Sequence, residues 1–453
     1  MFDLKLFKQL SQLCFCIILG LCGFGVIVFW PVVLNSCFVL EPNSIVYWFW
    51  KKIPNEVATE FYFFNWTNAD DFYNLSVKPK FDELGPYKFS QSEEKCNVIW
   101  NENGTVTYRE KKIWKHQGGN LDDVVVGVNY ITLAATTVTR FWKFYTRRYF
   151  FLILKPLFRS LFSTHTVSEL LFEGYSEPLI KIARALPIFH DLKFPNWDRF
   201  GWFYQRNGTT DFAGVVNMGT GINSTLGGQF FQRDLQPEEI LTFSPDLRRK
   251  FHLHFVGTEM VDNILGYKYV LGDRFFDNGT IFPENSCFCN GECVPYGMVN
   301  LSTTRHGFPL FLSLPHFFRA DPTYLQPIDG LKPNKNQHES ILIIEPTTGI
   351  PIEMRAKTQL NLLIRPVNGI SLVENVRQIF VPVWWTKQNI KLSGLSILFI
   401  KLIINLPIIC TSLGSLMIGI SFVLMTLFFN RRRRTDAKRI ILLKDEEVPL
   451  KRV

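Results

Sequence analysis

Two stretches of the chain contain no charged residue and are mostly apolar: residues 10–34 and residues 406–429. Each exceeds the roughly 20 residues that a helix needs to cross about 30 Å of hydrocarbon. Lys5 and Lys8 precede the first stretch, and Arg431–Arg434 follow the second after a single asparagine. Positively charged flanks stay on the cytoplasmic side of a membrane. The pattern therefore predicts two transmembrane helices with both chain termini in the cytoplasm.

With its two spans, the chain is expected to have five parts. The expected boundaries are a cytoplasmic tail at 1–9, a span at 10–34, an ectodomain at 35–400, a span at 401–429 and a cytoplasmic tail at 430–453. A cleaved signal peptide is the alternative for the N-terminus, but its apolar core has only about 7–15 residues. The core here is longer and no small-residue cleavage site follows it, which favours an uncleaved anchor.

Within the ectodomain, apolar and polar residues alternate most regularly over 350–365. Even positions such as Ile352 and Leu362 are mainly apolar, whereas odd positions such as Glu353 and Arg355 are mainly polar. A period of two predicts a strand with one buried face and one wet face. At about 3.3 Å per residue this strand would reach roughly 50 Å, a length that suits a large antiparallel barrel or a strongly bent sheet.

Other segments show shorter patterns. A hairpin is expected over 98–110, and short strands are expected at 341–345 and 251–255. Helix is expected mainly between about 121 and 186, where Thr166 and Glu169 have the spacing of a capping box. The ectodomain is thus predicted to be a β-rich body with a helical part.

Composition narrows the class of protein. The 453 residues include 49 Lys+Arg and 40 Asp+Glu, for a formal net charge of +9, and hydrophobic residues make up 47%. This apolar content is too high for a disordered chain. Residues 431–453 carry nine of the basic residues and four acidic ones. Most of the positive charge therefore belongs to one tail, and we expect no nucleic-acid partner.

Glycosylation signals support the proposed orientation. Asn-x-Ser/Thr sequons are the acceptors of N-linked glycans in secreted proteins. All seven lie between the two spans: Asn65, Asn74, Asn103, Asn207, Asn223, Asn278 and Asn300. Three of them, Asn103, Asn207 and Asn278, are followed by glycine, and Asn-Gly pairs favour tight turns that face water. The distribution predicts that the middle of the chain is outside the cytoplasm.

Cysteine usage agrees with an oxidising compartment. The predicted ectodomain contains Cys37, Cys96, Cys287, Cys289 and Cys293. Three thiolates close together without a fourth ligand make a poor zinc site, and disulfides are favoured on this side of a membrane. A short Cys289–Cys293 loop is the first choice. Because five is an odd number, at least one thiol is free or pairs with another chain.

Five cations lie in the bulky, aromatic segment 143–162: Lys143, Arg147, Arg148, Lys155 and Arg159. On a helix they would fall within an arc of about 160°, although Pro156 interrupts it. One reading is the solvated face of an outer helix. The other is a basic, aromatic surface for an anionic amphiphile or an acidic partner.

We find no sequence motif of a catalytic site. GxSxG, HExxH, a Walker A loop and a GxGxxG after a strand are all missing. His252 and His254 could share a strand face, but no third ligand stands at a diagnostic spacing. His316 is interpreted as a packed or hydrogen-bonded histidine. We therefore expect no enzyme activity, no cofactor and no metal.

Several motifs, in order along the chain, resemble one family of membrane proteins. They are Glu56–Phe64 with Gly85-Pro86-Tyr87, Glu169–Tyr175 with Pro178, Ser313–Phe317, Pro327–Gly330, Ile344–Gly349, Gln359–Leu363 and Val381–Trp384. Together with the two anchors they resemble the class B scavenger receptor family, which includes fatty acid translocase and lysosomal integral membrane protein type 2. The resemblance covers nearly the whole chain.

The resemblance implies an α+β membrane protein. Its ectodomain would be a large antiparallel β-barrel-like body with an apical helical bundle at about 121–186 and a lengthwise apolar tunnel. It implies a plasma-membrane or endolysosomal receptor that binds lipids or lipoproteins and passes fatty acids or sterols to the bilayer. The basic apex residues would attract anionic head groups. The alternative is a sorting or adhesion receptor for a protein cargo bound at the apex.

The chain also departs from this family. Cys289 and Cys293 resemble the short-loop disulfide of the family, but Cys287 lacks its usual partner. The tail at 445–453 resembles the acidic sorting signal of the lysosomal member, except that Lys451 replaces a bulky aliphatic residue. In the second span, small residues at 411, 415 and 419 form a ridge that could pack against the first span, against another copy, or face lipid.

Overall fold

The computed structural model describes residues 4–37, 41–42, 44–52, 56–102, 105–158, 160–185, 199–203, 212–217, 231, 233–244, 249–289, 292–302, 308–392 and 394–446. These residues form two compact units. Unit 1 comprises residues 1–49 and 397–453, and unit 2 comprises residues 50–396.

Unit 1 is built from two long apolar helices, α1 (Leu4–Cys37) and α7 (Leu395–Glu446). Both are long and apolar enough to cross a membrane, over Leu10–Asn35 and Leu395–Lys438. They pack through small residues. A Cβ atom added at Gly23 would lie 2.7 Å from the carbonyl oxygen of Gly414, and the Ser421 hydroxyl donates a 2.6 Å hydrogen bond to the Cys16 carbonyl.

This contact corrects one expectation about α7. The predicted ridge of Thr411, Ser415 and Gly419 does not face α1: Gly419 has open space around it, and Thr411 bonds to a carbonyl of its own helix. Gly414 and Ser421 form the packing face instead, because they are seven positions, or two turns, apart. That the ridge contacts a second copy stays a prediction.

Unit 2 contains an antiparallel sheet of twelve strands. Its main path is β6-β3-β2-β1-β14-β13-β12-β9-β8-β7, and β10 and β11 attach through β13. The strands are β1 (Val57–Trp66), β2 (Phe81–Trp100), β3 (Thr105–Gly118), β6 (Phe212–Asn217), β7 (Ile240–Ser244), β8 (Arg249–Val261), β9 (Ile264–Leu271), β10 (Val299–Asn300), β11 (Leu310–Ser313), β12 (Ile341–Ile344), β13 (Pro351–Ile364) and β14 (Ile379–Lys391). Within the described residues no pairing joins the outer strands β6 and β7.

The strand expected at 350–365 is confirmed as β13, but its polar face is only partly wet. Arg355 is half-buried, whereas Gln359 and Asn361 are fully buried. The Asn361 amide donates to the Ser313 hydroxyl at 2.9 Å, and the Gln359 oxygen accepts from the backbone N–H of His316 at 2.6 Å. The prediction of a wet face is therefore wrong for most of the strand. Glu353 and Lys357 are buried as well, and the segment around 313–316 covers Gln359 and Asn361.

The strand register shows which strands begin or finish together at each of the two ends of the sheet, which we call its edges. Ala58 of β1 lies opposite Asn389 of β14, so β1 begins and β14 ends at the same edge. We call it the proximal edge, because the chain leaves it toward α1 and α7. At the opposite, distal edge β13 ends at Ile364 and β14 begins at Ile379.

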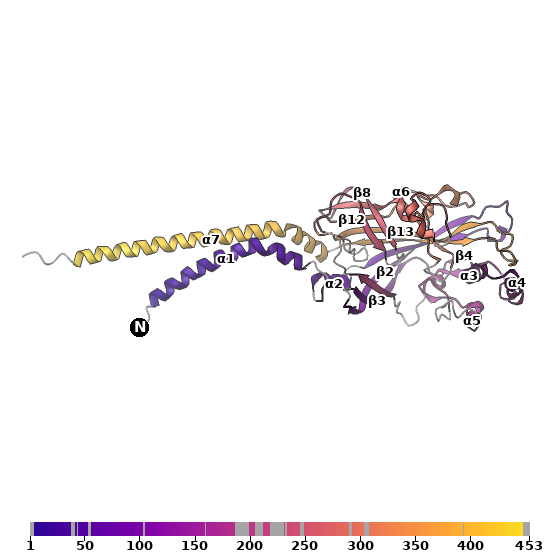
Figure 1. Cartoon of the computed structure of the whole chain (residues 1–453), viewed down its shortest axis with the longest axis horizontal. Helices are drawn as coiled ribbons and strands as arrows, with labels where there is room; N and C mark the ends of the chain where they lie inside the picture. The colour runs from indigo at the N-terminus through magenta and orange to yellow at the C-terminus, as the bar shows by residue number, and fades with distance from the viewer. Residues whose placement is uncertain are drawn as a thin grey trace, which may run out of the picture. The chain divides into compact units, whose positions relative to one another are not determined.

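Helices occupy much of the segment 121–186, as expected, but not all of it. Figure 1 shows α3, α4 and α5 gathered at one end of unit 2. A two-stranded sheet of β4 (Val124–Val128) and β5 (Phe162–Thr166) interrupts the predicted helical region. The helices of unit 2 are α3 (Tyr130–Thr139), α4 (Phe144–Ile153), a π-helical turn (Glu169–Glu173), α5 (Pro178–Ala185), α6 (Lys335–His338) and the 3-10 turns Ala69–Asp71, Asp273–Phe276, Pro283–Cys289, Pro315–Phe317 and Pro322–Tyr324; α2 (Ile45–Lys51) spans both units.

Local signals in the sequence are reproduced. Thr166 and Glu169 form the predicted capping box, with backbone-to-side-chain hydrogen bonds of 3.1 and 3.3 Å. The hairpin expected at 98–110 is the β2–β3 connection. The turn before residue 331 depends on Gly330, which has a φ of +102°. A Cβ atom there would collide with the Phe81 carbonyl, so only glycine fits.

An aromatic-rich core fills the sheet interior. Phe61 is fully buried and lies within 6 Å, between ring centroids, of the rings of Phe89, Phe203 and Trp384. Such edge-to-face contacts stabilise a core beyond the burial of area alone.

Candidate functional site

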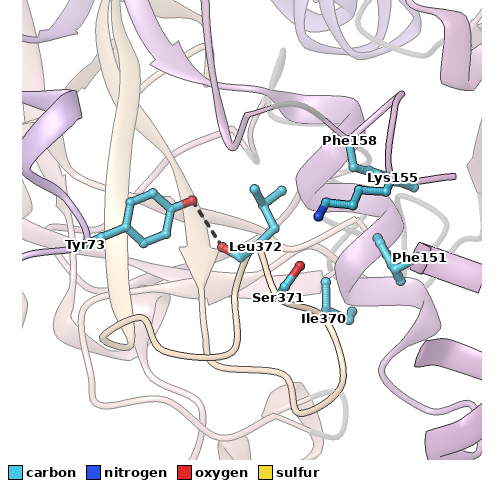
Figure 2. A pocket seen from close by; sticks show the side chains of 7 residues that line it. All are labelled: Tyr73, Phe151, Lys155, Phe158, Ile370, Ser371 and Leu372. Atoms are coloured by element: carbon cyan, nitrogen blue, oxygen red, sulfur yellow. Dashed lines mark hydrogen bonds between the residues drawn. The ribbon is translucent and has the colours of Figure 1, made fainter. Parts of the chain in front are cut away.

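A pocket of about 200 Å³ lies at the distal edge of the sheet. Figure 2 shows its lining, which comes from α4 and the turn after it, from the loop that joins β13 to β14, and from a residue before β2: Phe151, Lys155, Phe158, Ile370, Ser371, Leu372 and Tyr73. Four of its seven lining residues are apolar, polar atoms contribute at least as much of its surface as apolar atoms, and Lys155 is the one charged residue among the described lining residues. The pocket therefore combines apolar side chains with polar groups and an exposed cation.

Hydrogen bonds hold the pocket walls together. The Tyr73 hydroxyl donates to the Leu372 carbonyl at 3.2 Å, joining residues that are 299 positions apart. The loop is closed by its own backbone bonds, including Val367 N–H to the Val373 carbonyl at 3.1 Å. Gly369 has a φ of +83° and its N–H donates to Glu374 at 3.0 Å. The loop thus has a defined shape.

Arg147 connects α4 to this loop. Its Nε donates to the Asn368 carbonyl at 2.9 Å, and its terminal nitrogen donates to the carbonyls of Arg140 and Trp142 at 2.7 and 3.3 Å. The side chain is buried. Arg147 therefore positions α4, and it does not face a ligand.

The five predicted apex cations thus separate. Lys143, Arg148 and Lys155 are exposed, Arg147 is buried, and Arg159 lies outside the described residues. As the interruption at Pro156 suggested, the five cations do not form one stripe: α4 ends at Ile153, and the guanidinium of Arg147 donates to three backbone carbonyls. That the exposed cations bind a ligand stays a prediction.

The outer side of this region exposes large apolar residues. We call it the α4 surface; the exposed fractions are 78% for Phe141, 71% for Tyr145, 61% for Tyr149, 62% for Leu152 and 74% for Ile153. In the part of the chain that the structure describes, no carboxylate lies within ion-pairing distance of Lys143, Arg148 or Lys155. The α4 surface is therefore apolar and positively charged, a combination that suits an anionic amphiphile.

Charges deeper in this region are paired. Glu292 binds both Arg140, at 3.4 Å, and Arg365. Burial, with the nearby charge of Arg140, lowers the pKa of Arg365 to about 10. Sequence reasoning missed this cluster, because its three members come from separate parts of the chain.

The predicted disulfide is present. Cys289 bonds to Cys293, and Glu292 lies in the loop that this bond closes. Cys287 is exposed and Cys96 is half-buried, both as free thiols. The side chain of Cys37 lies outside the described part.

The sequons differ in their surroundings. Asn74 is exposed, Asn65 is half-buried, and Asn278 and Asn300 are each only 2% exposed. The Asn300 amide donates to the Cys289 carbonyl at 3.1 Å. The expectation that Asn-Gly pairs face water is wrong for Asn278, which packs beside the disulfide loop. Asn103, Asn207 and Asn223 lie outside the described residues, and glycosylation stays a prediction.

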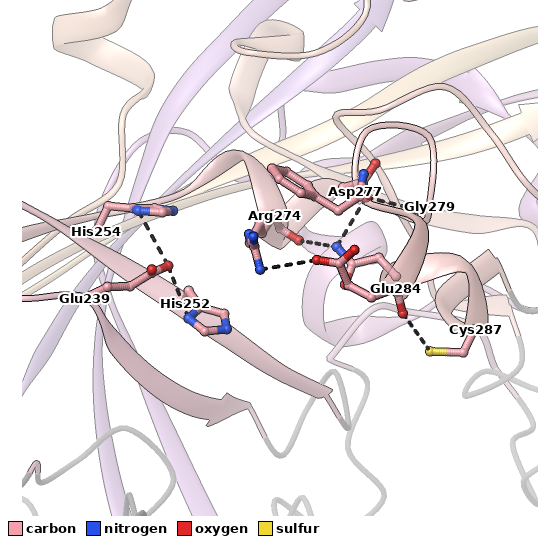
Figure 3. A network of polar contacts seen from close by, with 10 residues as sticks. Glu239, His252, His254, Arg274, Asp277, Gly279, Glu284 and Cys287 are labelled. Atoms are coloured by element: carbon pink, nitrogen blue, oxygen red, sulfur yellow. Dashed lines mark hydrogen bonds and ion pairs between the residues drawn. The ribbon is translucent and has the colours of Figure 1, made fainter.

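The histidines of the sheet make structural contacts. Figure 3 shows His252 and His254 on β8, both beside Glu239, with Nδ1 to Oε1 distances of 3.1 and 3.5 Å. Over the described ranges, no group of three side chains could hold a metal ion.

A neighbouring set of polar contacts, also drawn in Figure 3, involves no histidine. Arg274 pairs with Glu284 at 3.3 Å, and Asp277 accepts from the backbone N–H of Gly279 at 3.0 Å.

His316 belongs to a second buried network. Its Nε2 lies 2.7 Å from Glu83, its Nδ1 accepts from the Lys332 N–H, and its ring stacks on His338 at 4.4 Å. Burial, together with the neighbouring His316, lowers the pKa of His338 to about 4. Burial alone would raise the pKa of Glu83, but hydrogen bonds from His316 and Trp385 lower it. The interpretation of His316 as a hydrogen-bonded histidine is confirmed.

The pocket is smaller than the roughly 300–1,000 Å³ of a whole small-molecule site. At about 200 Å³ it accommodates one end of a ligand. Its apolar side chains suit the end of an acyl chain, and Lys155 suits an anionic group that stays near solvent. Sequence reasoning found Lys155 but missed Tyr73 and the loop 370–372, which carry no motif.

Comparisons with known proteins extend this picture. The family model described as the CD36 family matches residues 12–226 and 221–431. Protein peste of Drosophila melanogaster is 32% identical over 391 residues, 78% of this chain and 69% of the fly protein. Scavenger receptor class B member 1 of Bos taurus is 30% identical over 399 residues, 81% of this chain and 77% of the relative.

Lysosome membrane protein 2 of Rattus norvegicus is 29% identical over 413 residues, which cover 83% of each chain. The resemblance inferred from the motifs is therefore confirmed. With two helices that are long and apolar enough to span a membrane, an antiparallel sheet between them and a family match from residue 12 to residue 431, this chain belongs to the CD36 family.

Proposed function

We propose that this protein is a receptor that binds lipids or lipoproteins at the distal end of its ectodomain and passes fatty acids, sterols or similar amphiphiles to the membrane. The observation that carries the proposal is the pocket at the distal edge. Phe151 and Phe158 provide apolar walls, and Lys155 provides a positive charge near solvent. A binding step of this kind needs no catalytic group.

The proposal includes a route through the protein. An acyl chain that leaves the pocket must stay out of water on its way to the bilayer, because each exposed CH₂ group costs about 0.8 kcal/mol. A sheet bent into a barrel around an apolar tunnel, capped by a bundle of α3, α4 and α5, would provide this shelter. The length of β13 supports a strongly bent sheet of this kind.

The proposed topology follows from the helices of unit 1. α1 and α7 cross the membrane, the basic residues after Phe429 stay in the cytoplasm, and unit 2 faces outward. Residence at the plasma membrane or in an endolysosomal membrane would accord with the names of the relatives. Among the described sequons, exposed Asn74 is the one best placed to carry a glycan.

Lipid extraction with mass spectrometry tests the proposal. The full chain is purified in detergent, washed, incubated with oleate, cholesterol or phosphatidylcholine, and analysed in its native state. We expect one of these lipids to remain bound in stoichiometric amount. If that lipid is oleate, whose carboxylate would lie near Lys155, a smaller amount should remain bound to a Lys155→Glu variant. A protein that stays empty with all three lipids would contradict lipid binding.

The alternative function is a receptor for a protein cargo. The exposed aromatic residues of the α4 surface favour it, since Tyr and Phe are enriched in protein interfaces. Reversing the charge of Arg148 and Lys155, with Arg159, separates the two functions. Loss of cargo binding while lipid uptake continues would favour the alternative, and loss of lipid uptake would favour the lipid receptor.

A further inference from the structure

The hairpin of β8 and β9 ends in an uncovered apolar pair at the proximal edge. Met260 and Leu265 lie directly opposite each other in the register, and their exposed fractions are 61% and 49%. Residues directly opposite each other in a sheet point to the same face. The turn between them is short and defined, because Asp262 and Asn263 have φ angles of 48° and 62°.

The pair continues a buried apolar cluster. On β9, alternate residues share this face: Tyr269 is fully buried, Tyr267 is half-buried and Leu265 is exposed. Tyr269 packs with Phe231, Leu253, Leu342 and Ile344. Among the described residues none covers the end of this cluster at the hairpin tip.

The register places this tip near the start of α7. Asp262 forms an ion pair of 3.2 Å with Lys391, the last residue of β14. The candidate span begins at Leu395, four residues later, a reach of at most about 14 Å in extended chain. The hairpin tip and the point where the chain enters its second span therefore lie at the same edge of the sheet.

Charges around the tip are paired with one another. Besides Asp262 with Lys391, Glu259 binds Lys268 at 2.8 Å and Glu353 binds Arg355 at 2.6 Å. Three cations thus meet three carboxylates, and the local surface is neutral. A neutral surface with two large apolar side chains matches a zwitterionic phospholipid interface better than an anionic ligand.

We propose that the β8–β9 hairpin tip docks on the outer leaflet of the protein's own membrane, with Met260 and Leu265 among the phospholipid head groups. The inference rests on the two-span topology of the proposed function. The tip lies on the interface without crossing it, because Asp262 and Lys391 remain hydrated. Such a contact would set the distance between the ectodomain and the leaflet that receives lipid.

Photo-crosslinking tests this docking. The full chain is placed in phosphatidylcholine nanodiscs with p-benzoylphenylalanine at position 260, without added ligand. Leu398 of α7, 63% exposed, serves as the position that must react with lipid. Ile281, 45% exposed and near the disulfide loop whose Glu292 binds Arg365 beyond the distal edge, is the control, because it does not line the pocket.

We expect lipid adducts at 260 and 398 and none at 281, detected by mass spectrometry of the digested protein. A Leu265→Glu substitution should reduce the adduct at 260 several-fold, because a carboxylate resists leaving water. The proposal is overturned if 398 reacts and 260 does not, if 260 and 281 react equally, or if Leu265→Glu has no effect. These outcomes do not depend on ligand binding at Lys155, so the two proposals fail separately.

Discussion

The two ends of the large sheet both expose apolar side chains, but they differ in how their charges are arranged. At the distal end, Lys155 and Arg148 lie beside exposed aromatic residues, and no described carboxylate pairs with them. At the proximal edge, each charge near Met260 has a partner of opposite sign. Uncompensated cations favour an anionic ligand, whereas paired charges favour a neutral surface. Two surfaces that both expose apolar side chains can therefore have different partners.

The comparison extends to cations that are neighbours in sequence. Arg147 and Arg148 are adjacent on α4, but one is buried against three carbonyls and the other is exposed. The first stabilises the distal end and the second is available to a ligand. The predictions below separate these roles, beginning with the largest expected effect.

Arg147→Ala should destabilise the protein by about 3 kcal/mol, because three buried carbonyl oxygens lose their donor. Arg148→Ala, one position along the same helix, should change the free energy of unfolding by no more than about 0.5 kcal/mol. Urea denaturation of the detergent-solubilised chain, followed by tryptophan fluorescence, measures both. An Arg147→Ala protein of normal stability with weakened lipid binding would instead place Arg147 in the ligand site.

Lowering the pH should lower the free energy of unfolding, through His338. The pKa of His338 is about 4 in the folded protein and about 6.5 in an unfolded chain. Between these values the unfolded state binds a proton that the folded state excludes, so stability falls as pH decreases from 6.5 to 4. We expect a loss of about 1–3 kcal/mol over this interval and a smaller loss in His338→Gln. Parallel pH profiles of the two proteins would contradict this assignment.

Lys155→Glu should weaken binding of oleate about tenfold, equivalent to about 1.4 kcal/mol, because a favourable charge becomes a repulsive one. Lys155→Arg should bind nearly as well as the original chain, since it retains the charge. Displacement of a fluorescent fatty acid from the purified chain measures both. If Lys155→Arg and Lys155→Glu lose affinity equally, the shape of the pocket matters and its charge does not.

Ionic strength should have the smallest effect of the four, and it should act differently at the two ends of the sheet. Raising the ionic strength from about 0.05 to about 0.5 M should weaken oleate binding a few-fold, because it screens exposed charges. The lipid adduct at position 260 should not change, since the charges there are already paired. If salt changed the amount of lipid adduct at position 260 but did not change oleate binding at Lys155, charge would matter at the hairpin and not at the pocket, the opposite of what we expect.

Much of the architecture could be predicted because it depends on local patterns. A run of apolar residues long enough to cross a bilayer is a property of one segment, and 10–34 and 406–429 lie in α1 and α7 as expected. The same holds for the alternation in β13 and for the capping box at Thr166 and Glu169. The predictions failed where a distant segment decides burial, as for Gln359 and Asn361.

The candidate site shows the same division. Lys155 could be selected from its sequence neighbourhood, but the wall opposite it could not, because Tyr73 and Leu372 are 299 positions apart. The Cys289–Cys293 bond could be predicted, whereas the role of Glu292 inside its loop could not. Side chains that act together here come from different elements and leave no spacing to recognise.

The sequence by itself determined the two apolar helices, the long strand and the family, because each depends on residues near one another or on motifs in a fixed order. Only the tertiary structure decided which cations face water, which sequons are buried, and that Met260 and Leu265 lie near the start of α7. These properties depend on strand register and on packing between distant segments. Arg147 is buried and Arg148 is exposed because of the distant segments that lie near each of them in space. No local sequence pattern contains this information.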